Sequence, residues 1–261
     1  MSIESDPILG YRSFNLTSRV HKEAYAAISP SRPELSQAGK TVLVTGASGG
    51  IGLEIARSFG VAGAAKVILT GSHQGRIQDA TESLQKDDHG GTIFEGRICD
   101  VKDPTSIDSL WDDLEAAGIR VDVLVLNALA PSPRRKLLQL GWKQGWADWE
   151  ANVRSNYHFT DRFHNHARPD TSKRYICNVS TSAIHDWKST DSAPNYGLTK
   201  NAGTLLMQQV AREVAVSDTQ IISFHPGAIL TPGAQKLGLN ETSLHWDNSM
   251  NMARRKLLEF Y

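Results

Sequence analysis

Short apolar segments alternate with helical segments through most of this chain. Apolar strands are predicted at 41–46, 66–70, 92–101, 121–128, 174–180 and 220–227. Helical patterns are predicted between them at 51–63, 73–87, 106–118, 142–166 and 194–216. The strands are apolar throughout instead of at alternate residues, which is typical of a parallel sheet covered by helices on both faces. The pattern predicts a doubly wound α/β fold with six strands and no clear seventh strand.

The segment before the first strand differs from the rest of the chain. Residues 1–38 are polar, with Pro30 and Pro33 near their end, and predict an irregular arm with one short helix around 21–28. From residue 39 onward the sequence contains no linker, internal repeat or low-complexity stretch. We therefore predict one domain over 39–261.

The composition argues against several classes of function. The chain has 28 basic and 28 acidic residues, whereas a general nucleic-acid binder needs a basic face. Its two cysteines, Cys99 and Cys177, form no CxxC pattern, which favours a reducing compartment. The sequence holds no metal-ligand motif, no apolar run long enough to span a membrane and no signal-peptide pattern. We therefore expect a cytoplasmic protein with no metal, membrane or nucleic-acid partner.

A glycine-rich turn joins the first strand to the first helix. It contains Gly46, Gly49, Gly50 and Gly52, with Ser48 between them. Glycines let the backbone turn sharply and approach a ligand, and the N–H groups that begin the next helix favour an anion such as a pyrophosphate. Because the turn follows a strand and precedes a helix, it predicts a dinucleotide site.

Tyr196 and Lys200 lie four residues apart in the helix predicted at 194–216, so they share one face. A phenol alone is a poor acid or base at neutral pH, because its pKa is about 10. A nearby ammonium group favours the phenolate and lowers that pKa. The pair is therefore a candidate for acid–base catalysis, and an exposed Tyr–Lys pair on a solvated helix is the alternative.

Taken together, these motifs resemble the short-chain dehydrogenase/reductase family. The spacing TGxxxGxG at 45–52 is that family's form of the Rossmann fingerprint. The resemblance continues in the family's order through CDV at 99–101, NA at 127–128, Asn156, NVST at 178–181, YGLTK at 196–200 and HPGAILT at 225–231. The arm and the NVSTSAIH segment are also similar to fungal oxidoreductases of secondary metabolism. The resemblance implies that 39–261 is a single Rossmann-fold domain that both binds a dinucleotide and catalyses.

The resemblance implies catalytic roles for five polar residues. Tyr196 would give or take the proton of the substrate oxygen, and Lys200 would tune Tyr196 and hold the nicotinamide ribose. Asn156 would support a water-linked proton path from the lysine. Thr181 stands at the place of the family's serine, and its hydroxyl would orient the substrate oxygen. Ser182 is the adjacent candidate for that role, because the spacing from Thr181 to Tyr196 is longer than is common in the family.

The resemblance also implies which residues bind the cofactor. They are Thr45, Gly46, Ser48, Gly50, Ile51, Gly52, Asp100, Asn127, Tyr196, Lys200, Pro226, Gly227 and Thr231. Asp100 would recognise the adenine, and Asn127 would stabilise the central sheet. Pro226, Gly227 and Thr231 would belong to the loop that contacts the nicotinamide carboxamide.

The end of the second strand bears on the choice of cofactor. An NAD-binding site places an acid there for the ribose 2′-hydroxyl, whereas this strand runs into Gly71, Ser72 and His73. The lack of an acid favours NADP(H), because no carboxylate there repels the 2′-phosphate. Ser48, His73 and Arg76 are candidate partners of that phosphate.

Two predicted helices carry apolar residues whose partners the sequence leaves open. Trp142, Trp146 and Trp149 recur at helical spacing, which predicts a core stripe or, alternatively, a wall of the substrate site. The 196–216 helix is amphipathic, and family members commonly dimerise through the corresponding helix. The resemblance therefore implies a homodimer through 196–216.

We predict an NADP-dependent oxidoreductase that transfers a hydride between nicotinamide and a carbonyl or alcohol of a small organic substrate, such as a secondary-metabolite intermediate. The alternative is a catalytically weak or inactive nucleotide-binding member. It is favoured by Thr181, by Leu129 in place of a family glycine, and by a short, truncated C-terminus that lacks the further strand and helix usual in the family. The same fold also supports lyases and isomerases.

Overall fold

The computed structural model describes residues 25–87, 90–130, 132–167, 172–185, 187–236 and 238–241. Six strands in these residues form one sheet in the order β3-β2-β1-β4-β5-β6, and every neighbouring pair is parallel. The strands are β1 Thr41–Val44, β2 Lys66–Gly71, β3 Ile93–Ile98, β4 Val123–Leu126, β5 Arg174–Val179 and β6 Thr219–Phe224. The predicted six-stranded, doubly wound sheet is therefore confirmed. The strand order reverses between β1 and β4, which is where such sheets bind ligands.

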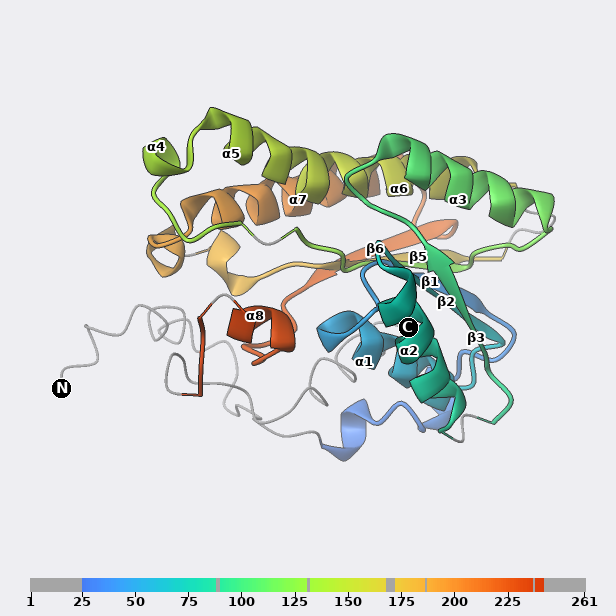
Figure 1. The fold of residues 1–261 in the computed structure, drawn as a ribbon. Helices are drawn as coiled ribbons and strands as arrows, with labels where there is room; N and C mark the ends of the chain where they lie inside the picture. Colours follow the sequence, from blue (N-terminus) through green and yellow to red (C-terminus); the bar gives the residue numbers. More distant parts are fainter. Residues whose placement is uncertain are drawn as a thin grey trace.

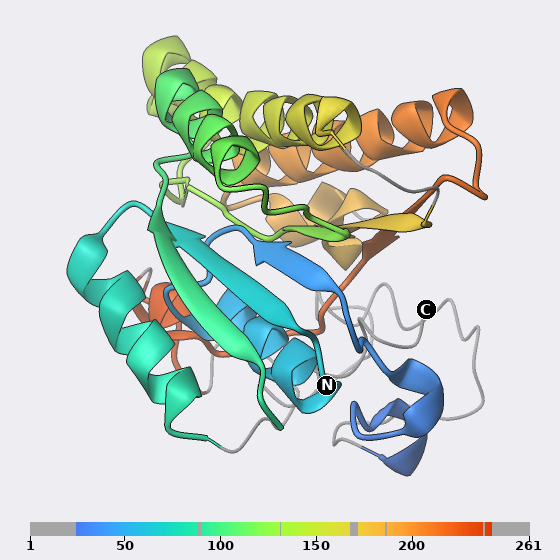
Figure 2. The ribbon, with the colours of Figure 1, turned by 90° about the vertical axis from the view of Figure 1, so that its right-hand side faces the viewer.

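Helices cover both faces of this sheet (Figure 1). They are α1 Gly50–Val61, α2 Gln74–Gln85, α3 Pro104–Ala116, α4 Leu137–Leu140, α5 Trp142–Trp149, α6 Ser155–Asn165, α7 Pro194–Glu213 and α8 Pro232–Lys236. α1 and α2 pack on one face, whereas α3, α6 and α7 pack on the other, and Figure 2 shows the two helical layers on either side of the twisted sheet.

Each inner strand is apolar throughout because both of its faces are buried. In β1, Val42 and Val44 belong to the core under α1 and α2, while Leu43 between them belongs to the core under α3, α6 and α7. Side chains of a strand alternate between faces, so a strand in the middle layer needs apolar residues at every position. The fully buried ring of Trp111 fills the second core beside Phe159.

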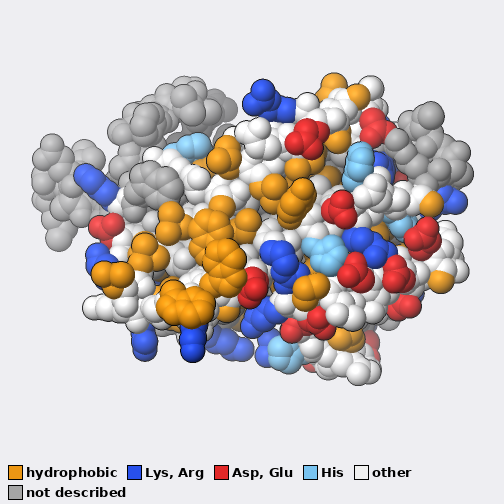
Figure 3. Space-filling view, turned by 90° about the horizontal axis from the view of Figure 1, so that it is seen from above, with side chains coloured by type: hydrophobic (Ala, Val, Ile, Leu, Met, Phe, Trp, Pro, Cys, Tyr) orange, Lys and Arg blue, Asp and Glu red, His pale blue; other side chains and the backbone are white. Residues whose placement is uncertain are grey.

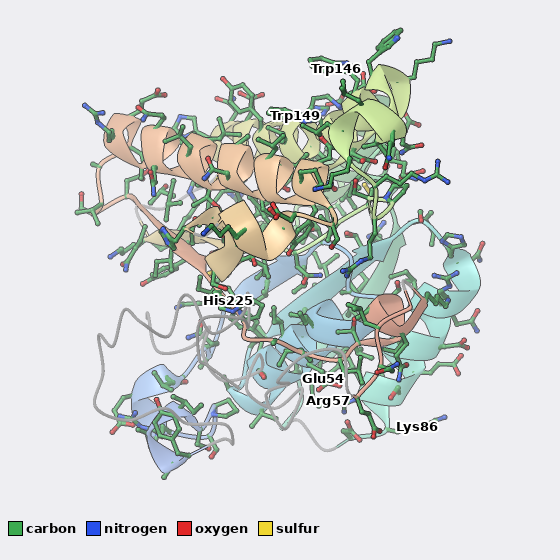
Figure 4. All side chains as sticks on the ribbon, turned by 90° about the vertical axis from the view of Figure 1, so that its left-hand side faces the viewer. Glu54, Arg57, Lys86, Trp146, Trp149 and His225 are labelled. Carbon is green, nitrogen blue, oxygen red and sulfur yellow. The ribbon has the colours of Figure 1, made fainter. Side chains whose placement is uncertain are left out.

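The helix predicted at 142–166 is divided into three parts. A π-helix, η5 Glu150–Arg154, separates α5 from α6. Trp142 and Trp146 are 77% and 61% exposed, so the predicted core stripe is wrong for these two residues. α5 packs against α4, η5 and α7, and these two tryptophans lie on its outer face. Figure 4 shows Trp146 and Trp149 at the α5 end of the upper helical layer.

The described part of the arm contains two 3₁₀ turns, η3 Ala26–Ile28 and η4 Pro33–Leu35. Ile28 is fully buried and packs with Ile51 of α1 and with Ile229, in the loop after β6. The arm therefore anchors that loop to the start of α1. The first part of the predicted helix at 21–28 lies outside the described residues, as does the chain after residue 241.

Candidate functional site

The glycine turn after β1 has a shape that only glycine allows at two positions. Gly46 and Gly50 have φ of 65° and 57°, in the left-handed region that L side chains avoid. A Cβ on Gly46 would also lie 2.8 Å from the Cα of Ala128, and one on Gly52 would lie 2.5 Å from the side-chain nitrogen of Asn127. The turn is therefore pressed against the segment that follows β4.

Thr45 and Asn127 hold this turn together at the point where the strand order reverses. The Thr45 hydroxyl donates to the Val125 carbonyl at 3.1 Å and accepts from the backbone N–H groups of Asn127 and Ala128 at 2.9 and 3.0 Å. The Asn127 amide donates to the carbonyls of Thr45 and Gly46 at 2.9 and 3.1 Å. These bonds hold the turn rigidly and leave the first N–H groups of α1 to face an anion.

The loop after β6 closes over the same turn. A Cβ on Gly50 would lie 3.4 Å from the methyl group of Thr231, so that residue stands directly over the glycine. The Thr231 hydroxyl accepts from Ala234 N–H at 3.1 Å and so caps α8, while Gly227 turns the loop with a φ of 101°. The turn and this loop thus meet as the sequence prediction requires.

Tyr196 and Lys200 lie in the first turns of α7, beside the carboxyl end of β5. The Lys200 ammonium donates to the Val179 carbonyl at 2.6 Å, and burial lowers the pKa of Lys200 to about 8. Burial raises the pKa of Tyr196, and the hydrogen bond of its hydroxyl with Thr181 acts in the opposite direction. Burial of Tyr196 therefore favours its protonated phenol, which is the form that donates a proton.

The structure distinguishes the hydroxyl groups at the end of β5. Ser180 turns toward α7, where its hydroxyl lies 2.6 Å from that of Thr204. Thr181 is the residue that hydrogen-bonds with Tyr196, and its hydroxyl also accepts from Ala183 N–H at 3.3 Å. Ser182 begins the 3₁₀ turn η6 Ser182–Ile184. The geometry thus favours Thr181 over Ser182 as the partner of Tyr196.

Asn156 lies in α6 directly after the π-helix and faces α7. A Cβ on Gly203 would lie 3.7 Å from its side-chain nitrogen, so Gly203 provides the space for this amide. The Asn156 carbonyl accepts from the Thr160 hydroxyl at 2.7 Å. π-helical turns recur at functional sites because they shift the helix register locally.

The residues predicted to recognise the adenine and the 2′-phosphate lie at the carboxyl ends of β2 and β3. The Asp100 carboxylate accepts from Lys102 N–H at 3.0 Å, which shapes the turn after β3. The Ser72 hydroxyl lies 2.9 Å from Nδ1 of His73, and both residues are exposed, as is Arg76. A Cβ on Gly71 would lie 3.4 Å from Cβ of Ser48, so the glycine turn and the end of β2 are neighbours.

Sequence reasoning missed three polar residues that support this edge of the sheet. The Asn152 side chain in η5 accepts from Ala130 N–H at 2.8 Å and donates to the Ala130 carbonyl at 3.2 Å, which holds the segment after β4. Asp148 and Asn195 form a buried pair next to Tyr196. The one available signal was the position of Asn195 directly before the tyrosine.

Two classes of site find no support in the described part of the chain. Across its residues, no three His, Cys, Asp or Glu side chains come together in a way that could hold a metal ion. None of its helices is both long enough and apolar enough to cross a membrane.

Comparison with known proteins places these features in a family. Residues 40–242 match the model of the short chain dehydrogenases. A short chain dehydrogenase/reductase of Claviceps purpurea is 30% identical over 237 residues, which cover 89% of this chain and 76% of that protein. The short chain dehydrogenase pgmD of Aspergillus terreus is 28% identical over 243 residues, which cover 88% and 76%.

Experimental structures share the same fold. L-sorbose reductase from Gluconobacter frateurii, complexed with NADPH and L-sorbose, aligns with a TM-score of 0.70 and 23% identity over 80% of this chain and 78% of that one. A short-chain dehydrogenase from Sphingobium yanoikuyae in complex with NADPH aligns with a TM-score of 0.73 and 20% identity over 85% and 84%.

Proposed function

As a member of the short-chain dehydrogenase/reductase family, the chain is an oxidoreductase that acts on carbonyl or alcohol groups, and we propose that it uses NADP(H) on a small organic molecule. The observation that carries the proposal is the convergence of Thr181, Tyr196 and Lys200 at the carboxyl end of β5. These groups share the carboxyl edge of the sheet with the glycine turn, because all six strands are parallel. The similarity of the NVSTSAIH segment to fungal oxidoreductases of secondary metabolism supports a secondary-metabolite intermediate as the substrate.

The residues present fit a bound dinucleotide. The glycine turn would receive the pyrophosphate at the start of α1, because its tight packing against the segment after β4 fixes its shape and the first N–H groups of a helix favour an anion. Asp100 would hold the adenine end, and the loop with Pro226, Gly227 and Thr231 would hold the nicotinamide. When bound, the cofactor supplies or accepts the hydride.

The protein's own contribution is to position the carbonyl and to move its proton. The Thr181 hydroxyl would donate to the substrate oxygen, and Tyr196 would protonate that oxygen as its negative charge develops. Lys200 would stabilise the phenolate left behind, since the two residues are one helical turn apart on the same face of α7. Asn156 would support the return of a proton to Tyr196 through water at the contact between α6 and α7.

NADP(H) is the proposed cofactor because no acid follows β2. Ser72, His73 and Arg76 are exposed there, and Ser48 lies beside them. Arginine, hydroxyl and imidazole groups suit a 2′-phosphate, which carries negative charge. Two solved relatives of the same fold contain NADPH, which supports this choice.

We also propose a homodimer through α7 and the neighbouring α6, with residence in the cytoplasm. Figure 3 views the layer of α5, α6 and α7 from above and shows hydrophobic side chains gathered on part of that face. Leu205 of α7 and Tyr157 of α6 are 51% and 57% exposed. Exposed apolar groups of this size favour contact with another protein surface. Sedimentation velocity of the protein and of Leu205→Glu tests the dimer, which should dissociate in the variant.

Turnover measurements test the proposed activity. The protein is mixed with NADPH or NADH and a panel of polyketide-like and terpenoid ketones, and oxidation of the cofactor is followed by absorbance. Tyr196→Phe should lose about a hundredfold or more in kcat, because the variant lacks the proton donor. Turnover near the wild-type rate in Tyr196→Phe would remove the proposed acid. Tight NADPH binding without turnover across the panel would favour the inactive nucleotide-binding member instead.

A further inference from the structure

A buried carboxyl group joins three segments next to the catalytic tyrosine. Asp148 of α5 is only 2% exposed, and both of its oxygens accept hydrogen bonds. One oxygen accepts from the Ser132 hydroxyl at 2.6 Å and from the Asn195 amide at 2.8 Å. The other accepts from the Gln144 amide at 2.9 Å. A buried carboxyl group is costly unless it is bonded in this way, so its position implies a specific role.

Asn195 is the member of this cluster that reaches the active site. It is the second residue of α7, it is 3% exposed, and it directly precedes Tyr196. Its amide oxygen accepts from the indole N–H of Trp149 at 3.2 Å, and its nitrogen also donates to the Gly145 carbonyl at 3.3 Å. The amide nitrogen and the amide oxygen of Asn195 thus both bond to residues of α5, and these bonds hold the first turn of α7.

Besides this cluster, the first turns of α7 are held by Thr190, which packs against Gly197, and by the bond of Lys200 to the Val179 carbonyl. The N-cap residue of α7, Ala193, makes no side-chain cap, and Asp191 and Ser192 before it are exposed. The segment after β4 is tied to the same place twice, since Ser132 bonds to Asp148 and the Arg134 guanidinium donates to the Ser192 hydroxyl at 2.7 Å. Movement of the Asp148–Asn195 contact would therefore displace the turn that carries the Tyr196 phenol.

We propose that Asp148 and Asn195 form a positioning pair that fixes the first turn of α7, and with it the Tyr196 hydroxyl, against the segment after β4. The inference rests on the proposed role of Tyr196 as proton donor. Neither residue of the pair touches the reacting atoms. Their effect is on the geometry of the Tyr196–Thr181 contact, and a shift of about 1 Å at such a contact costs up to about a hundredfold in rate.

The test uses Asn195→Ala and Asp148→Asn in the full chain. With the best ketone of the panel, we expect kcat to fall about tenfold to a hundredfold in both variants, with the Kd for NADPH unchanged. The matched control is Gln37→Ala. Gln37 is also buried and loses its bonds to Leu35 and Lys40, but it precedes β1 at the opposite edge of the sheet. The control should lower Tm without changing kcat.

A second readout does not depend on turnover. The chain has six tyrosines, so protein labelled with ¹³C at the tyrosine Cζ gives few resonances, and Tyr196→Phe identifies that of Tyr196. We expect this resonance and its titration curve to shift in Asn195→Ala and Asp148→Asn, and to stay unchanged in Gln37→Ala. The reciprocal double variant Asp148→Asn with Asn195→Asp restores one donor–acceptor contact and should return the resonance and kcat part of the way.

Two outcomes separate the claims. If Asn195→Ala lowers Tm as the control does but leaves the Tyr196 resonance and kcat at wild-type values, the positioning pair is overturned. If Asn195→Ala does not fold, the nearly isosteric Asp148→Asn decides by the same readouts. A displaced Tyr196 resonance in a protein that turns over no carbonyl would support the pair and reject the proposed substrate chemistry.

Discussion

Gly52 offers the sharpest test of how the glycine turn is built. A Cβ at this position would lie 2.5 Å from both the Asn127 side-chain nitrogen and the Gly46 carbonyl oxygen, and 3.0 Å from Cα of Ala47. Two of these three atoms belong to the backbone, so the side chain of Asn127 alone cannot relieve the clash. In Gly52→Ala the turn must shift or Asn127 must leave it.

The expected loss of stability follows from the contacts that break. Asn127 would lose its bonds to the Thr45 and Gly46 carbonyls, each worth about 1 kcal/mol. Overpacking of the turn costs a further 1–3 kcal/mol or so. Alanine is favoured over glycine inside a helix by about 1 kcal/mol, which offsets part of this. The free energy of unfolding should fall by about 2–4 kcal/mol, which lowers Tm by roughly 4–16 °C in a chain of this size.

Thermal unfolding by circular dichroism, with and without NADPH, measures this effect. Gly75→Ala is the control, because Gly75 also lies in the first turn of a helix and a Cβ there meets nothing within 4 Å. We expect the control to be at least as stable as the wild type and to bind NADPH normally. The reasoning is refuted if Gly52→Ala unfolds within 1 °C of the wild type and binds NADPH with unchanged affinity.

Three further predictions concern the hydroxyl groups, the lysine and the phosphate site. Thr181→Val should lower kcat about a hundredfold by removing a donor to the substrate oxygen, whereas Ser182→Ala should stay within about twofold; steady-state kinetics would contradict the assignment if the order were reversed. The pKa of Lys200, about 8 in the fold against 10.5 as its ordinary value, means that the unfolded chain binds more protons between these values. Stability should therefore rise with pH from about 8 toward 10 and this rise should vanish in Lys200→Met, as measured by Tm against pH. Arg76→Ala should weaken NADPH binding about tenfold and leave NADH binding unchanged, and equal losses for both cofactors in titration calorimetry would place the 2′-phosphate elsewhere.

Much of the architecture follows from local patterns. The unbroken apolar strands predict burial on two faces, and the observed alternation of Val42, Leu43 and Val44 between two cores is the reason. The glycine spacing after β1 predicts the tight turn, because only glycine adopts the backbone angles found at Gly46 and Gly50. Tyr196 and Lys200 share a face by helical periodicity alone.

Other features depend on contacts between distant segments. Thr181 is distinguished from its neighbours only by tertiary contacts, because the Ser180 hydroxyl meets Thr204 whereas that of Thr181 meets Tyr196, one residue of α7 in each case. The tryptophan spacing in α5 is that of a core helix, yet Trp142 and Trp146 are exposed, because the packing of α5 against α4, η5 and α7 leaves them on its outer face.

The Asp148–Asn195 contact shows the same limit at the active site. The two residues are separated by 47 positions, and nothing in either local pattern distinguishes them from ordinary polar residues of helices. Periodicity reports which face of an element is apolar, whereas the partner of that face is set by how the elements pack. The succession of strands and helices and the glycine turn can therefore be predicted from the sequence, but the contacts that orient the reacting groups arise only when α5, α7 and the end of β5 come together.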